Sequence, residues 1–178
     1  MDKKEIRQTM IKRRMMLDEE EYQLNSLKII EKFLTSSFFY NDAPLGIYVP
    51  IKKEVNTLPL IKSLLEKNIS IALPKVGRDN MYFYEINCLE DLELGSFNIY
   101  EPKSICKKIY PNVLIVPLVA FNRHKERIGY GKGYYDRYIS TYHPVTIGFA
   151  FECQCCDFIK ENHDQALDYI ISEKAIYE

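Results

Sequence analysis

The sequence predicts an α/β protein, a single-domain three-layer sandwich whose mainly parallel sheet is covered by helices on both faces. Short apolar runs of four to six residues alternate along the chain with helical segments, which is the pattern of strands buried between two helical layers. The 178 residues are 47% hydrophobic and 28% charged, as expected for a soluble globular protein. No internal repeat or linker interrupts residues 1–178, so we expect one domain.

The first third of the chain is predicted to be helical. Residues 2–16 carry apolar residues at helical spacing, namely Ile6, Met10 and Ile11. Asp18, with Glu21 three residues later, has the pattern of a capping box. A second helix is therefore expected from this point through about Leu34.

Apolar runs predict the strands that follow. They are residues 45–50, 69–74, 81–86, 113–118, 145–150 and 167–172. Thr57 can cap a helix that ends near Lys67, and another helix is expected after the glycine cluster described below, as far as about Ser140. Residues 87–111 have no such pattern and are expected to be mostly loop.

Charge and cysteine content limit the classes of partner and compartment. The formal net charge of −1 gives no reason to expect nucleic acid or a membrane as a partner. Five cysteines without a regular framework favour reduced thiols, and no stretch has the length of a signal peptide core or a membrane span. We therefore expect a cytoplasmic protein, and a monomer.

The most informative segment is "RIGYGKGYYDRYI", residues 127–139, which holds three of the seven glycines within five residues. It fits neither the Walker phosphate loop nor the dinucleotide fingerprint, because Tyr134 stands where the second motif needs glycine and Lys132 is not followed by Ser or Thr. Glycines nevertheless allow backbone N–H groups to approach phosphate oxygens at the start of a helix.

Charged side chains beside these glycines suit the same chemistry. Arg127 and Lys132 would add positive charge, and Asp136 could hold a magnesium ion that phosphates also bind. In parallel sheets, ligands bind beyond the carboxyl ends of the strands, and this segment follows the strand at residues 113–118. A tight turn with solvated charges explains the spacing equally well.

The longer segment "VPLVAFNRHKERIGYGKGYYDRYI" resembles the signature region of the 5-formyltetrahydrofolate cyclo-ligases, also called methenyltetrahydrofolate synthetases. Further motifs resemble the family in the same order: "KKEIR", "EVNT", "ALPKV", "GFAFECQ" and "ENHDQALDYIISE". The resemblance spans nearly the whole chain. It implies that ATP and magnesium are used to convert 5-formyltetrahydrofolate into 5,10-methenyltetrahydrofolate through a phosphorylated formyl group, with release of ADP and phosphate.

The resemblance also implies roles for individual residues. Arg127 and Lys132 would act at the transferred phosphate. ATP would be bound by Lys3, Arg7, Arg127, Ile128, Gly129, Tyr130, Gly131, Lys132, Gly133, Tyr134 and Tyr135. Folate would be bound by Val49, Glu54, Tyr130, Gly131, Lys132, Gly133 and Tyr134. Magnesium would be held by Asp136 and Asp164.

Each of these roles has a plainer alternative. Lys3 and Arg7 could belong to a solvated basic helix, and Asp164 to a surface loop. The tyrosines could pack in the core. Glu54 could be a solvated carboxylate paired with Lys52 or Lys53.

Two positions depart from the family pattern. The family usually has Asp where this chain has Asn122, and Gly where it has Lys125. Gly at the second position suggests a positive φ angle, in which Lys would cost about 1 kcal/mol. The shape of the turn at residues 122–126 is therefore open.

Two other functions remain possible from the sequence. One is a catalytically silent relative that binds nucleotide or RNA, for which the amino terminus offers six basic residues: Lys3, Lys4, Arg7, Lys12, Arg13 and Arg14. The other is a sugar-phosphate isomerase of similar architecture, since a fold alone does not determine the chemistry.

Overall fold

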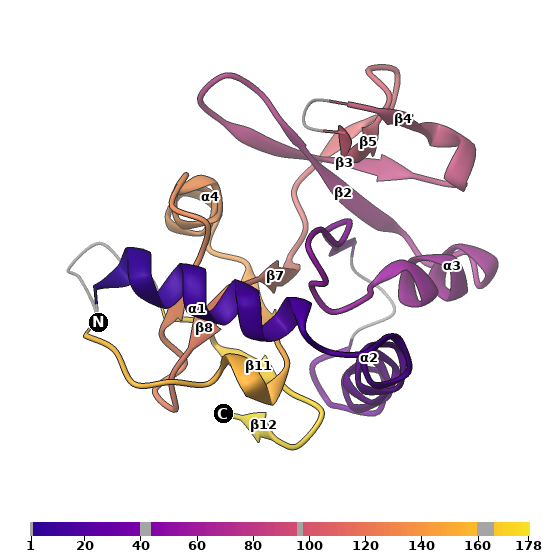
Figure 1. The fold of residues 1–178 in the computed structure, drawn as a ribbon. Helices are drawn as coiled ribbons and strands as arrows, with labels where there is room; N and C mark the ends of the chain where they lie inside the picture. Colours follow the sequence, from indigo (N-terminus) through magenta and orange to yellow (C-terminus); the bar gives the residue numbers. More distant parts are fainter. Residues whose placement is uncertain (1, 40–43, 96–97, 160–165) are drawn as a thin grey trace.

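The computed structural model describes residues 2–39, 44–95, 98–159 and 166–178. Its central sheet has the order β12-β11-β10-β7-β1-β2-β3-β6, and Figure 1 labels β12, β11, β7, β2 and β3 of these strands. These strands are β1 Leu45–Gly46, β2 Ile71–Val76, β3 Met81–Ile86, β6 Lys108–Ile109, β7 Val113–Pro117, β10 Val145–Phe149, β11 Tyr169–Ile171 and β12 Ile176–Tyr177. The five neighbours from β11 to β2 are parallel, and antiparallel strands extend both edges. The predicted α/β class is confirmed.

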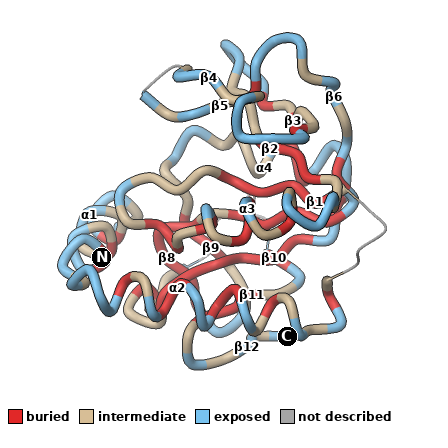
Figure 2. The backbone as a smooth tube through the Cα atoms, turned by 90° about the vertical axis from the view of Figure 1, so that its right-hand side faces the viewer, coloured by how far each residue is buried: buried red, intermediate tan, exposed pale blue. Residues whose placement is uncertain are grey.

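Alternate residues of the central strands pack into two different cores. In β7, Val113 and Ile115 belong to the core under α2 (Glu19–Leu34) and α3 (Leu58–Glu66), whereas Leu114 and Val116 face the core under α4 (Tyr134–Tyr142). Figure 2 shows these strands as buried segments inside a more exposed shell. A strand buried on both sides has to be apolar at successive positions, which explains the uninterrupted run that predicted it.

The first helix, α1 (Lys3–Met15), packs away from the central sheet. Ile6 and Met10 contact the short hairpin formed by β8 (Ala120–Phe121) and β9 (Arg127–Ile128). Asp2 and Glu5 form a complete capping box at its start. At the start of α2, Asp18 forms one half of the predicted capping box by accepting from the Glu21 amide at 2.8 Å. The amino-terminal helix is thus placed beside the segment that leads into the glycines.

The segment at residues 87–111, predicted to be mostly loop, holds more regular structure than expected. It contains η1 (Leu89–Asp91), the antiparallel pair β4 (Leu92–Leu94) and β5 (Tyr100–Pro102), and β6 at the sheet edge. Lys75 of β2 anchors the β4–β5 pair, with its Nζ atom 3.0 Å from Glu93 and 3.3 Å from Glu101. These contacts join residues that are distant in sequence, so no local sequence pattern predicts them.

Two local details correct the expected geometry. Thr57 precedes α3 as predicted, but its side chain does not cap the helix and instead donates to the Tyr48 carbonyl at 2.7 Å. Lys125 does adopt the left-handed region, with φ of 62°. The Asn122 Oδ1 atom accepts from the backbone amides of His124 and Glu126, which holds the turn. The turn therefore keeps the shape that glycine would favour.

Among the described residues, no helix has both the length and the hydropathy that crossing a membrane requires.

Candidate active site

The glycine loop, residues 129–133, connects β9 to α4. Gly131 has a φ of 92° and Gly133 a φ of 68°, a region that L side chains rarely adopt. Gly133 is also the N-cap of α4 and has no side chain, so the first amides of this nine-residue helix are not capped from that position. A bare helix start with open amides is suited to an anion.

Three arginines from two elements, α1 and β9, contact this loop. Arg7 of α1 donates through Nε to the Gly129 carbonyl at 2.8 Å, and Arg14 donates through Nη2 to the Tyr130 hydroxyl at 2.7 Å. A Cβ atom added to Gly129 would lie 3.0 Å from Nη1 of Arg127. Arg7 therefore lies beside the glycine loop, and Lys3 lies one turn earlier on the same helix.

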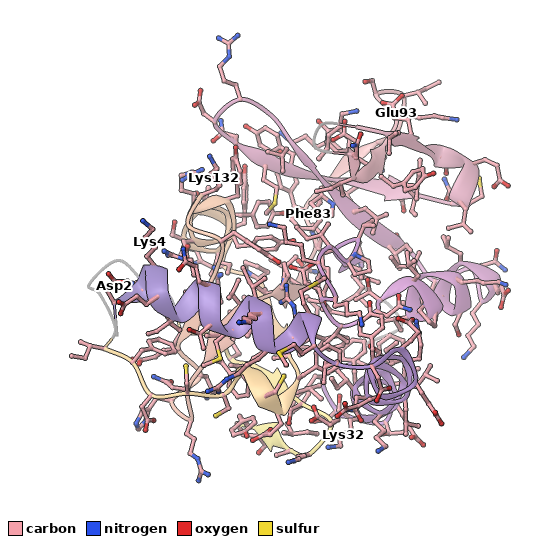
Figure 3. All side chains as sticks on the ribbon, in the orientation of Figure 1. Asp2, Lys4, Lys32, Phe83, Glu93 and Lys132 are labelled. Carbon is pink, nitrogen blue, oxygen red and sulfur yellow. The ribbon has the colours of Figure 1, made fainter. Side chains whose placement is uncertain are left out.

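Arg127 and Asp136 form an ion pair across the loop. Nη2 of Arg127 lies 2.7 Å from Oδ1 of Asp136, and Arg127 is only 5% exposed. The idea of Arg127 as a solvated loop charge is therefore wrong. The charge of Asp136 is therefore neutralised by Arg127. Lys132, by contrast, is exposed just before α4 (Figure 3).

A cavity of about 180 Å³ lies between the glycine loop and the carboxyl ends of the parallel strands. It brings together four of the predicted folate and loop residues, Val49, Glu54, Tyr130 and Tyr134, and also Tyr135. Its other lining residues are Tyr48, Ile51, Pro74, Val76, Met81, Ile99, Tyr100, Glu101 and Pro117. A mainly apolar and aromatic wall with one buried carboxyl group is typical of a site for a flat heterocycle.

Glu54 is the buried acid of this cavity, with 3% exposure. Burial raises the pKa of Glu54 to about 7, against the opposing effects of the Ile51 amide, Arg14 and Tyr130. The Ile51 amide donates to Oε2 at 2.9 Å, and the Tyr130 hydroxyl forms a further hydrogen bond to the carboxyl group. The alternative of a solvated carboxylate paired with Lys52 or Lys53 does not fit this environment. A ligand that offers N–H donors would favour the charged form.

Arg14 is a site residue that sequence reasoning missed. It is 1% exposed and donates to the carbonyls of Lys52 and Leu118 at 3.0 Å and 3.1 Å, besides Tyr130. It therefore ties α1 to three segments that surround the cavity. A signal was present, because residue 14 falls four positions after Met10 on the buried face of α1. A basic residue in register with an apolar face indicates a buried charge.

The other missed residues divide by their location in the fold. Tyr48 follows β1, Pro117 ends β7 and Pro74 lies two residues before the end of β2. These positions are near the carboxyl ends of the strands, where a parallel sheet binds ligands, so strand order could have indicated them. Ile99 and Tyr100 come from the segment that was expected to be loop. No sequence signal pointed to that part of the wall.

Of the two predicted metal ligands, the structure describes Asp136 but not Asp164. Asp136 is about one-third exposed and has one oxygen on Arg127, which leaves the carboxylate able to offer one ligand to a cation. Asp164 lies outside the described residues. Among the residues that are described, no group of three or more His, Cys, Asp or Glu side chains could hold a metal ion alone. This donor set suits a cation that takes most of its ligands from phosphate and water, as Mg²⁺ does.

Together these features define a class: an α/β protein with a basic, glycine-rich loop beside a cavity with an aromatic wall. Residues 1–173 match the model of the 5-formyltetrahydrofolate cyclo-ligase family. The chain therefore belongs to that family, which confirms the resemblance and the expectation of an enzyme of this kind.

Individual relatives agree over nearly full length. The 5-formyltetrahydrofolate cyclo-ligase of Mycoplasma pneumoniae is 33% identical over 98% of this chain and 100% of its own length. The enzyme of the same name from Escherichia coli K12 is 26% identical over 93% of this chain and 97% of its own. The NMR structure of Aquifex aeolicus 5,10-methenyltetrahydrofolate synthetase superposes with a TM-score of 0.90 at 31% identity, over 99% and 92% of the two chains.

Proposed function

We propose that this chain uses ATP and Mg²⁺ to convert 5-formyltetrahydrofolate into 5,10-methenyltetrahydrofolate, with release of ADP and phosphate. The observation that carries the proposal is the shared wall between two sites. Tyr130 and Tyr134 belong to the glycine loop or the helix start that follows it, and both also line the cavity that contains Glu54. A nucleotide phosphate at the loop and a pterin in the cavity would thus lie side by side.

Glu54 is suited to hold the pterin. The ring system carries an amino group and adjacent N–H donors, and a carboxylate can accept two of them side by side. The aromatic rings around the cavity offer flat apolar contacts to the ring. Val49 adds an apolar contact from the segment that follows β1.

The glycine loop is suited to hold the phosphates. Open amides at the start of α4, together with Lys132, Arg127, Lys3 and Arg7, supply the positive charge that phosphoryl transfer requires. Asp136 would hold Mg²⁺, with Asp164 as its expected companion; the ion would neutralise phosphate charge when bound.

The proposed reaction has two steps. The formyl oxygen attacks the γ-phosphorus, the bond to the bridging oxygen of ADP breaks, and a phosphorylated imidate forms. N10 then attacks the formyl carbon, its proton is released, and the C–O bond breaks to free phosphate. Phosphorylation makes the oxygen a good leaving group, so the work of the protein is positioning and charge neutralisation.

An absorbance assay tests this proposal. The purified chain is incubated with 5-formyltetrahydrofolate in the presence and absence of ATP and Mg²⁺, and formation of the methenyl product is followed by its absorbance. We expect product only when all three are present. Absence of product at high enzyme concentration would overturn the proposal, and tight RNA binding in the same preparation would then favour the silent binding relative.

The environment of the basic residues does not favour that alternative. Of the six basic residues near the amino terminus, Arg14 is buried, Arg7 is hydrogen-bonded to Gly129 and Lys3 is half-buried, so only Lys4, Lys12 and Arg13 are exposed. A basic face for nucleic acid needs solvent-exposed cations.

A further inference from the structure

A second cavity, of about 220 Å³, lies between β3 and α4. Its aromatic lining comes from Tyr82, Tyr134, Tyr138 and Tyr142. Met81 and Tyr134 line both this cavity and the first one, so the two adjoin at these side chains. A ligand that extends beyond the first cavity can therefore continue into the second.

Positive charge marks the boundary between the two cavities. The guanidinium carbon of Arg137 lies 5.1 Å from the centre of the Tyr134 ring, and Arg137 lines the second cavity. Nη2 of Arg137 donates to the Asp79 carbonyl at 3.2 Å. The guanidinium group has further N–H groups that can donate to a ligand. Lys108 lies outside the lining, with its Nζ atom 3.2 Å from the centre of the Tyr82 ring, which does line the cavity.

Tyr138 adds a buried hydrogen-bond donor to the cavity wall. It is 3% exposed, packs edge-on against Phe83, and its hydroxyl has no hydrogen-bond partner among the residues that the structure describes. Burial, reinforced by Tyr142 and Tyr110, raises the pKa of Tyr138, so the hydroxyl keeps its proton. A buried hydroxyl without a partner is unfavourable unless a ligand supplies the acceptor.

We propose that this second cavity binds the glutamate tail of the folate substrate, with Arg137 as its carboxylate-binding residue. The proposal rests on the proposed function. A tetrahydrofolate carries a p-aminobenzoyl group and one or more glutamates, which offer amide carbonyls and negative charge. Tyrosine rings can pack against the amide planes, the Tyr138 hydroxyl can donate to a carbonyl, and Arg137 can pair with a carboxylate. A pterin held at Glu54 sends its tail out of the first cavity, past Met81 and Tyr134.

Calorimetry on the full-length chain, without ATP, tests this tail site apart from turnover. The dissociation constant is measured for 5-formyltetrahydrofolate with one glutamate and with three, for the native chain and for Arg137→Ala. We expect the triglutamate to bind the native chain more tightly. Because Arg137 is exposed, we expect its replacement to weaken triglutamate binding about three- to tenfold and monoglutamate binding less.

Two further variants make the result specific. Tyr138→Phe removes only the hydroxyl, so we expect weaker folate binding together with an unchanged or higher melting temperature, an outcome that a purely structural hydroxyl would not give. Lys62→Ala, on the exposed side of α3, is the matched control for loss of a surface cation and should leave both dissociation constants unchanged.

The outcomes separate the two proposals. If the native chain binds both folates and neither Arg137→Ala nor Tyr138→Phe alters the dissociation constants, the tail site is wrong and the proposed function stands. If the native chain binds neither folate, the proposed function fails and the tail site fails with it.

Discussion

The Nη2 atom of Arg14 lies 2.7 Å from the hydroxyl oxygen of Tyr130, and the same hydroxyl is hydrogen-bonded to Glu54. One tyrosine thus joins the end of the first helix to the buried acid of the first cavity, where we propose that folate binds. Because Arg14 also holds the Lys52 and Leu118 carbonyls, it fixes the position of segments from both proposed binding sites. Arg14 acts as a positioning residue.

Arg14→Lys should destabilise the chain and weaken folate binding. A lysine cannot reach three acceptors at once, so buried carbonyls lose their donor, at a cost of about 2–4 kcal/mol. The free energy of unfolding from urea titration and the KM for folate measure the two effects. Arg13→Lys, at the exposed neighbouring position, is the matched control and should change stability by less than about 0.5 kcal/mol. Equal behaviour of the two variants would contradict the positioning role.

Glu54→Gln should stabilise the ligand-free chain at alkaline pH. The folded pKa of about 7 exceeds the ordinary 4.5, so the unfolded chain loses its proton first as pH rises. Stability therefore declines between about pH 4.5 and 7, by on the order of 3 kcal/mol, and a neutral amide avoids this loss. Urea midpoints at about pH 8 and pH 5 measure the difference. The gain should be large at the higher pH and small at the lower.

A pH-independent effect of Glu54→Gln would show that the carboxyl group is not held neutral by burial. Glu66→Gln, on the exposed end of α3, serves as the control and should show little change at either pH.

Lys132→Ala and Arg127→Ala should both reduce turnover, but only one should reduce stability. Each removes a positive charge near the proposed phosphate, and the loss of one such contact lowers the rate on the order of a hundredfold. Because Lys132 is exposed, the melting temperature of Lys132→Ala should equal that of the native chain. Because Arg127 is buried against Asp136, Arg127→Ala should have a lower melting temperature. Near-normal turnover in Lys132→Ala would place its charge away from the phosphates.

Asp136→Asn should raise the magnesium concentration needed for half-maximal rate, since a neutral amide is a poorer ligand for a hard cation. Loss of the Arg127 ion pair should lower the melting temperature whether or not a metal binds there. Magnesium titration separates the two roles. If stability falls while the half-saturation point stays the same, Asp136 serves Arg127 alone.

The sequence predicted the α/β fold because apolar runs and helix caps are local signals. Thus β7 could be identified from its uninterrupted run, and α2 from Asp18. It could not predict β4, β5 and β6, which depend on distant partners such as Lys75 and β3. Local propensity carries no information on such pairings.

The candidate site also contains residues that the sequence could predict and residues that it could not. The glycines and Glu54 belong to short motifs and could be assigned from the resemblance. The burial of Arg127 and Arg14 depends on how distant segments pack around them. The motif gave the residue types, and tertiary structure decided which charges are solvated.

The most direct test of the central claim is the KM for 5-formyltetrahydrofolate of Glu54→Gln, determined by initial rates beside the KM for ATP. Removing the charged acceptor should leave pterin donors poorly paired, at a cost of about 1–3 kcal/mol. We predict a rise in the folate KM of roughly five- to 150-fold, with the ATP KM little changed. An unchanged folate KM with a raised ATP KM would contradict the account, because it would place the nucleotide, and not folate, at Glu54.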